Sequence, residues 1–277
     1  MTTTLRPGSG SETLLARIVP LPGTSARRAS LMVERNALVY RRSWVIIVSG
    51  FFEPFFYLLS IGIGLGALVG TVSLDGRMIE YTVFVAPALL ASSAMNGAVY
   101  DSTFNIFFKL KYAKTYDAIL STPMSPGDVA AGEITWALIR GLIYSTTFLA
   151  VMLALGLVGS PWAVLVLPAA VLIGFGFAAV GMAATTYMRG WQDFEFVQLC
   201  ILPMFLFATT FYPLATYPSA LQAVVVCTPL YHAVELIRSL TTGLVDGTVV
   251  IHIGYLVVMG LIGLRVAGRR LEKLLLT

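Results

Sequence analysis

The sequence has 277 residues, of which 57% are hydrophobic and only 12% are charged, and its mean hydropathy is +0.85. Nearly all residues lie in or beside long apolar stretches, which excludes an ordinary soluble protein and leaves no room for a soluble catalytic domain. The net charge of +4 and the pI near 9.1 come from arginines and lysines at the ends of these stretches. We therefore expect contact with anionic lipid headgroups and no nucleic-acid partner.

Residues 1–26 are rich in Thr, Ser, Gly and Pro and are predicted to form a flexible cytoplasmic tail. They contain no continuous apolar segment, so we expect no cleaved signal peptide. Residues 27–42 place Leu31, Leu38 and Val39 at helical spacing among arginines. This pattern predicts an amphipathic interfacial helix on the cytoplasmic surface of the membrane. The alternative is that these residues extend the first membrane span inward.

Six apolar stretches reach the ~20 residues that a helix needs to cross a ~30 Å hydrocarbon layer. They comprise residues 44–69, 81–100, 132–157, 162–186, 195–214 and 249–268. A helix satisfies its own backbone polar groups in lipid. The predicted fold class is therefore an all-α membrane protein, with six transmembrane helices in a single domain over residues 43–277. Basic residues precede the first span and follow the second, fourth and sixth, which predicts that both termini are cytoplasmic.

Glu53 and Arg140 are charged residues within the first and third predicted spans. At ~1.5 Å per residue, both lie about 12–13 Å from the cytoplasmic start of their spans. An unpaired charge at that depth is costly, so an ion pair between them is predicted. The alternative is that Arg140 contacts the substrate.

The largest predicted cytoplasmic loop lies between the second and third spans. Residues 111–120 have a helical pattern, and Pro123, Pro126 and Gly127 are expected to end the helix. Ser125 or Asp128 is expected to cap the helix of the third span. A short helix held between two spans is suited to docking of a soluble partner; the alternative is a solvated linker.

Residues 213–246 are too long for a simple outer turn and too interrupted for another span. Thr228-Pro229 breaks the apolar run, which predicts two short re-entrant helices, tolerable only where they are buried in protein or line a wet cavity. His232 and His252 stand alone in the sequence, so no metal site is predicted. Cys200, in the middle of the fifth span, is predicted to be a small buried apolar residue.

No G-x-x-x-x-G-K-[ST] loop occurs in the sequence, so we expect no ATP hydrolysis by this chain alone and no bound cofactor. Paired carboxylates and the G-x-S-x-G and H-E-x-x-H patterns are also missing, and no catalytic residue is predicted. Gly62, Gly64 and Gly66 lie within an apolar span, where small residues favour close helix packing.

Four stretches of the sequence together resemble the permease subunits of type-2 ABC transporters. They are FFEPFFYLLSIGIGLG at 51–66, YTVFVAPALLASSAMNGAVYDSTF at 81–104, KTYDAILSTPMSPGDVAAGEITWALIR at 114–140 and PMFLFATTFYPLATYPSALQAVVVCTPLYHAVELIRSL at 203–240. Within that family the chain is similar to the nodulation lipo-oligosaccharide export branch and to daunorubicin-resistance permeases. The substrate does not transfer safely with a resemblance of this kind.

The resemblance implies a six-span subunit of the bacterial cytoplasmic membrane that dimerises, with a homodimer expected, and carries two ABC ATPase subunits that bind ATP and Mg. It implies outward export of an amphiphile: a glycolipid, a lipo-oligosaccharide or a hydrophobic drug. It also implies that the helix at 27–42 and a coupling helix contact the ATPase. The coupling-helix residues are Thr115, Tyr116, Asp117, Leu120, Ser121 and Thr122.

Two other functional classes are weighed against this one. An ion-coupled secondary transporter of a hydrophobic substrate often shows inverted repeats, and residues 42–157 and 162–277 show no convincing similarity. A membrane enzyme acting on lipids needs clustered polar residues at one interface, and the sequence has no such cluster. A neighbouring gene for an ATPase with a phosphate-binding loop would distinguish the ABC permease from both.

Overall fold

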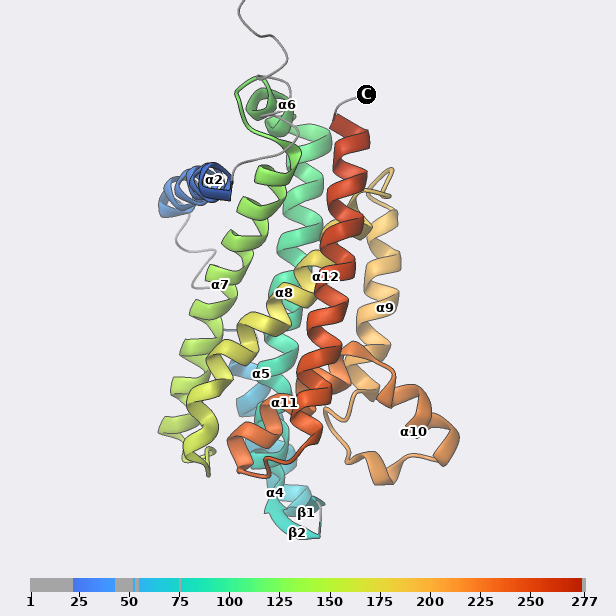
Figure 1. Cartoon of the computed structure of the whole chain (residues 1–277). Helices are drawn as coiled ribbons and strands as arrows, with labels where there is room; N and C mark the ends of the chain where they lie inside the picture. The colour runs from blue at the N-terminus through green and yellow to red at the C-terminus, as the bar shows by residue number, and fades with distance from the viewer. Residues whose placement is uncertain (1–21, 43–51, 53–54, 75, 276–277) are drawn as a thin grey trace, which may run out of the picture.

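The computed structural model describes residues 22–42, 52, 55–74 and 76–275, with the side chains of 22–26, 42, 63 and 275 left aside. Long helices run side by side in a bundle, and one helix lies across it (Figure 1). The helices are α2 (Pro22–Arg42), η1 (Leu58–Leu65), α4 (Gly66–Val69), α5 (Tyr81–Tyr100), η2 (Asp101–Asn105), η3 (Phe108–Tyr112), α6 (Thr115–Leu120), α7 (Pro126–Ala154), η4 (Pro161–Leu165), α8 (Val166–Thr185), α9 (Asp193–Phe207), η5 (Leu214–Thr216), α10 (Ser219–Val226), α11 (Pro229–Thr242) and α12 (Thr248–Leu275).

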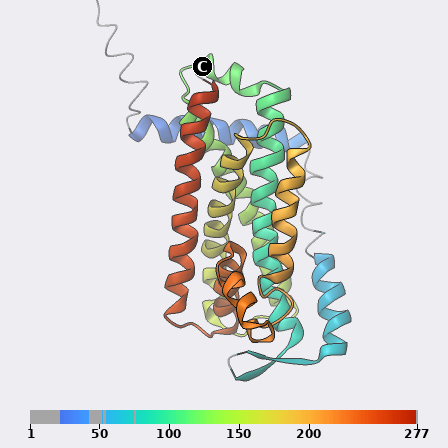
Figure 2. The same ribbon diagram turned by 90° about the vertical axis from the view of Figure 1, so that its right-hand side faces the viewer.

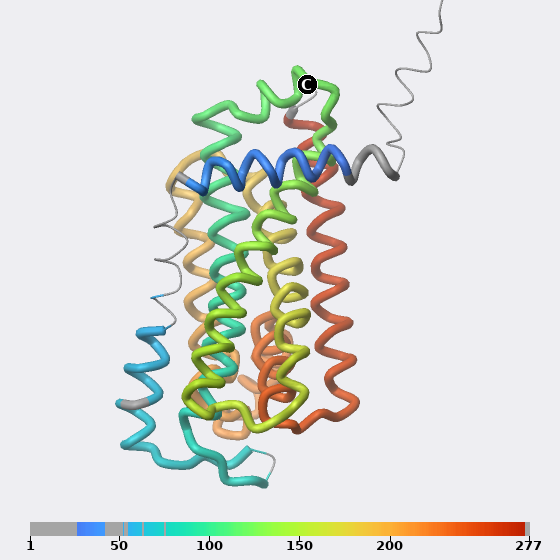
Figure 3. The backbone as a smooth tube through the Cα atoms, turned by 90° about the vertical axis from the view of Figure 1, so that its left-hand side faces the viewer, coloured from blue at the N-terminus to red at the C-terminus, as the bar shows by residue number. Residues whose placement is uncertain are grey.

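The two ends of the bundle differ. We call one the α6 end, because it carries α6 together with the C-terminal turns of α12 (Figure 1). The other is the hairpin end, where strands β1 (Thr71–Leu74) and β2 (Arg77–Glu80) form a small sheet. Helix α2 crosses the bundle near the α6 end (Figure 3).

Helices α5 and α8 form the centre of the bundle, with α7, α11 and α12 packed around them. Small side chains permit these close approaches, as in other membrane bundles. At Gly263 of α12 an added Cβ would lie 2.7 Å from the backbone nitrogen of Val180 on α8. At Gly176 of α8 it would lie 2.6 Å from the terminal methyl of Met259 on α12. The α8–α12 contact therefore depends on Gly263, which faces backbone atoms, whereas the flexible Met259 side chain could move away from a Cβ at Gly176.

Four helices in the described part of the chain are long and apolar enough to cross a membrane: Tyr81–Tyr112, Pro126–Ala154, Pro161–Thr185 and Thr248–Leu274. The pair Ser219–Val226 and Pro229–Thr242 passes the same test together but is bent by 84°, so the count is five if the pair is one broken span. This result confirms a mostly helical membrane protein. Two short helices are also confirmed in the predicted re-entrant segment; their place in the membrane stays a prediction.

The first and fifth predicted spans are not among these candidates. Residues 43–51 and 53–54 lie outside the described part, as does the predicted tail at 1–21, and the apolar helix that follows covers Phe55–Val69. Helix α9 ends at Phe207 rather than at residue 214, and its 15 residues span about 22 Å at ~1.5 Å each. The six-span count therefore stays a prediction.

The β1–β2 hairpin is an element that the sequence analysis did not predict, and it leaves the all-α fold class unchanged. Its strands pair antiparallel, with Thr71 opposite Glu80 and Leu74 opposite Arg77. Gly76 at its turn has φ 79°, a conformation that favours glycine. The hairpin lies beside the segment 55–69, which stands next to the bundle (Figure 2). There a Cβ added at Gly62 or Gly66 would lie 2.9 or 2.8 Å from the Thr82 side chain, which confirms close packing at these two glycines, whereas Gly64 has open space around it.

Candidate functional site

The loop at the α6 end is held by the start of α7. Ser125 is the N-cap: its hydroxyl accepts from the amide of Asp128 at 3.2 Å, and the Asp128 carboxylate accepts from the amide of Ser125 at 3.0 Å. This reciprocal pair is a capping box and satisfies two helix-terminal donors. Pro126 thus begins α7, whereas the sequence predicted that it would end the preceding helix.

Helix α6 is shorter than the predicted coupling helix and begins after Lys114, whose φ of 46° turns the chain sharply. Tyr116 is its one buried residue, and it anchors the helix to the bundle. Burial, reinforced by the negative charge of Glu133, raises the pKa of the Tyr116 hydroxyl well above 10.0, so it stays protonated. The other predicted contact residues are exposed (Asp117, Ser121, Thr122) or half-buried (Thr115, Leu120).

A first buried polar cluster joins three segments below α6. The Lys109 ammonium on η3 lies 2.8 Å from both carboxylate oxygens of Glu133 on α7. Asn36 on α2 donates to Glu133 at 3.2 Å and accepts from Lys109 at 3.2 Å. Asn36 and Glu133 are buried. The buried Glu133 carboxylate is therefore stabilised by the Lys109 charge and by the Asn36 hydrogen bond, because little water can reach it.

A second buried cluster surrounds Arg140, further along α7. Its guanidinium donates to the Asp101 carboxylate at 2.6 Å, to the Tyr40 hydroxyl at 2.9 Å and to the Tyr144 hydroxyl at 3.0 Å. The Arg140 Nε is buried without a hydrogen-bond partner in the described residues. Glu53, the partner predicted from the sequence, lies outside the described part of the chain. The partner that the structure does place on Arg140 is Asp101.

Asp101 was not predicted as the partner of Arg140, because the second predicted span ends at residue 100. In the structure the helix runs on through η2 and η3 to Tyr112, so Asp101 lies within it and faces α7. The sequence does contain a signal for this pair. Asp101 directly follows the span and precedes Lys109, Lys111 and Lys114, and a helix extended by three turns would have included Asp101.

Helix α2 contributes to both clusters through one face. Asn36 and Tyr40 are one helical turn apart, and each joins a different cluster. The side chain of Met32, one turn earlier, lies directly against Gly132 of α7. The opposite face carries Leu31 and Leu38, which are 53% and 60% exposed. One side of α2 is therefore fixed to α7, and an apolar side remains uncovered.

The hairpin end holds a third polar network around Arg238 on α11. Its guanidinium pairs with Glu235 at 2.5 Å and donates to the carbonyl of Thr209 at 2.7 Å. It also lies 4.0 Å from the ring centroid of Phe84 on α5. The network fastens α11 to α5 and to the turn that follows α9.

Two sequence predictions about single residues are wrong. His232 and His252 do not stand alone: their Nδ1 atoms lie 2.8 Å apart in a hydrogen bond between α11 and α12. No group of three or more metal-ligating side chains accompanies them in the described residues. Cys200 is exposed rather than buried, because α9 turns this side of the helix toward a groove.

Comparison with known proteins identifies the family. Residues 28–241 match the family described as ABC-2 type transporter, a range that includes α6 and both buried clusters. The chain belongs to this family. It is a transmembrane permease of the ABC transporter class, which confirms the resemblance seen in the sequence.

Proteins named Nodulation protein J are similar over most of this chain. The one from Rhizobium leguminosarum bv. viciae is 32% identical over 248 residues, 87% of this chain and 93% of the relative. The one from Sinorhizobium fredii is 30% identical over 246 residues, 88% and 92% of the two chains. The one from Rhizobium meliloti is 31% identical over 227 residues, 80% and 84% of the two chains.

Proposed function

We propose that this chain is the permease subunit of an ATP-driven exporter that moves an amphiphile outward from the inner leaflet of the bacterial cytoplasmic membrane. Family membership and the similarity to Nodulation protein J support this function. The amphiphile is a glycolipid, a lipo-oligosaccharide or a hydrophobic drug. The α6 end faces the cytoplasm, where two ATPase subunits bind ATP and Mg, and a second copy of the chain completes the transporter.

The observation that carries this proposal is the construction of the α6 end. Helix α6 presents an exposed surface that includes Asp117, while Tyr116 and the Ser125 capping box fix it against the bundle. Movement of a docked ATPase would therefore displace α6 together with the start of α7. The Glu133 and Arg140 clusters would pass that displacement to the helix at 81–112, because buried ion pairs resist separation. They would also pass it to α2 through the hydrogen bonds of Asn36 and Tyr40.

The experiment measures ATPase activity and complex formation. The purified chain alone is expected to release no phosphate from ATP, and activity is expected only when a candidate ABC ATPase subunit is added. Asp117→Arg reverses an exposed charge on α6 and is expected to weaken co-purification of the ATPase by tenfold or more, about 1.4 kcal/mol. Membrane insertion should be unchanged, because the side chain is exposed.

Glu272→Arg is the matched control, since it is the same kind of charge reversal at an exposed position of the same end, on α12. It is expected to leave co-purification intact. Equal loss in both variants would indicate a general electrostatic effect, and normal co-purification of Asp117→Arg would contradict docking at α6.

A further inference from the structure

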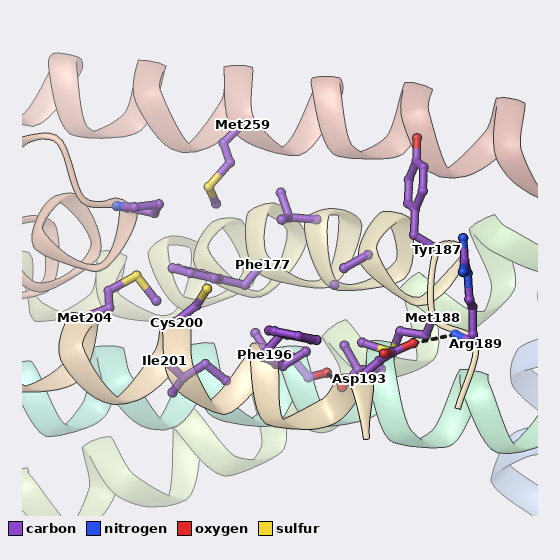
Figure 4. A pocket seen from close by; sticks show the side chains of 17 residues that line it. Phe177, Tyr187, Met188, Arg189, Asp193, Phe196, Cys200, Ile201, Met204 and Met259 are labelled. Atoms are coloured by element: carbon purple, nitrogen blue, oxygen red, sulfur yellow. Dashed lines mark hydrogen bonds between the residues drawn. The ribbon is translucent and has the colours of Figure 1, made fainter. Parts of the chain in front are cut away.

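A groove open to the side of the bundle runs along α9. It has a volume of about 660 Å³, within the ~300–1,000 Å³ typical of ligand sites. Side chains from α5, α8, α9 and α12 line it, and most are apolar, among them Phe177, Phe196, Met204 and Met259 (Figure 4). From Asp193 to Met204 the α9 side of the groove measures about 16 Å at ~1.5 Å per residue. This length is close to one leaflet of a ~30 Å hydrocarbon core.

At the α6 end of the groove one guanidinium group, that of Arg189, belongs to the lining, and that of Arg270 adjoins the lining residue Tyr187. Arg189 lies at this end beside Tyr187, and Cys200 and Met204 lie further along (Figure 4). Arg270 of α12 stacks over the Tyr187 ring at 4.2 Å, and its Nε is buried without a hydrogen-bond partner in the described residues. Asp193 is the acidic residue of the lining, and its carboxylate already accepts from the backbone amides of Arg189 and Gly190.

We propose that this groove binds one acyl chain of an anionic phospholipid, with the phosphate held by Arg189 and Arg270. Guanidinium groups match the geometry of phosphate oxygens and form charge-assisted hydrogen bonds with them. The apolar lining accepts a chain that is already in the hydrocarbon layer. The site concerns a resident membrane lipid, so it does not depend on the proposed export function.

A neighbouring groove provides an internal comparison. It has a volume of about 680 Å³, lies between α8 and α12, and shares Val180 and Met259 with the first. None of the residues that line it is charged. It is therefore expected to take acyl chains of any phospholipid, whereas the groove along α9 selects by headgroup.

Cys200 lines the groove and is exposed, so its alkylation reports occupancy. The sequence has two cysteines, and Cys227→Ser leaves Cys200 alone. The full chain is purified in a neutral detergent, and the rate of reaction with N-ethylmaleimide is measured against added phosphatidylglycerol, phosphatidylcholine or inorganic phosphate. Phosphatidylglycerol is expected to slow alkylation at concentrations about tenfold lower than phosphatidylcholine, and phosphate alone should give no protection.

Arg189→Gln combined with Arg270→Gln is expected to reduce protection by phosphatidylglycerol to the level of phosphatidylcholine. Arg265→Gln is the matched control, because it removes the same charge from an exposed position on another face of α12. Elution from size-exclusion chromatography verifies the fold of each variant. Equal protection by both lipids, the same loss in Arg265→Gln, or a Cys200 that never reacts would overturn the proposal. Disulfide-linked dimers through Cys200 would overturn it too, since a second copy would then cover the groove.

Discussion

Replacing Arg140 by methionine leaves the Asp101 carboxylate without the donor that lies 2.6 Å from it. The two side chains are 9% and 13% exposed, so water can replace little of the lost interaction. Removing one partner of a buried ion pair typically costs about 3–5 kcal/mol. The upper half of this range is expected here, because the Tyr40 and Tyr144 hydroxyls also lose their donor.

Asp101→Asn removes the charge but keeps an oxygen that can accept from Arg140, so a smaller loss of about 1–3 kcal/mol is expected. In the double variant neither charge is left unpaired. Its loss should therefore be smaller than the sum of the single losses, by about 0.5–3 kcal/mol, the range for residues in contact. The loss of the Tyr40 and Tyr144 hydrogen bonds occurs in Arg140→Met and in the double variant alike. It therefore does not contribute to the coupling energy between Arg140 and Asp101.

The free energies of unfolding of these variants would be measured by equilibrium unfolding in detergent micelles, with circular dichroism as the signal. Arg140→Met combined with Asp246→Asn is the control, because Asp246 lies in the loop before α12 at the hairpin end, and the two losses should add. Additivity of Arg140→Met and Asp101→Asn within about 0.5 kcal/mol would refute the reasoning. A further pair with Glu53→Gln tests the partner predicted from the sequence, since the buried Nε of Arg140 has no hydrogen-bond partner among the described residues.

Gly263→Ala is expected to destabilise the protein by about 1–3 kcal/mol, because the new Cβ would lie 2.7 Å from the α8 backbone. Gly254→Ala, with open space around it on the same helix, should be neutral or slightly stabilising in the same thermal unfolding measurement. Ser125→Ala removes the cap of α7 and should cost about 0.5–2 kcal/mol, seen as faster hydrogen exchange in the first turns of that helix. Lys109→Met leaves the Glu133 carboxylate buried without its cation and should cost about 3–5 kcal/mol, with partial recovery in Lys109→Arg; an unchanged midpoint of unfolding would contradict the ion-pair assignment.

The long apolar helices could be predicted from the sequence because each one satisfies its own backbone and needs only length and composition to be recognised. Helix ends were harder to predict. The helix from Tyr81 continues to Tyr112 through charged residues, since Asp101 and Lys109 find partners on α7. Helix α9 instead ends at Phe207, where the chain turns through Thr209 at φ 56°. In both cases tertiary contacts decide the boundary.

The hairpin has a local signal in the sequence, whereas the buried pairs form only through tertiary packing. The dipeptide Asp75-Gly76 is a local hairpin signal that the apolar pattern around it obscures. The contact between His232 and His252 has no local signal, because the two residues are brought together only when α11 packs on α12. The same is true of the Asp101–Arg140 pair, where helix spacing alone gives depth in the membrane but not rotation about the helix axis.

At α2 the structure shows how the helix is rotated about its own axis, which the sequence pattern alone does not give. From the sequence, Leu31, Leu38 and Val39 define one face of an interfacial helix, and the structure leaves that face exposed. The contacts that fix α2 to the bundle lie on the other face, where Met32, Asn36 and Tyr40 meet α7 in successive turns. Two of these contacts are hydrogen bonds to buried charged groups, Asn36 to Glu133 and Arg140 to Tyr40. Sliding α2 along α7 would break both, at a cost of about 1.5–3 kcal/mol each. Helix α2 and the first turns of α7 should therefore move as one body, with the apolar face of α2 left free to lie on the membrane surface.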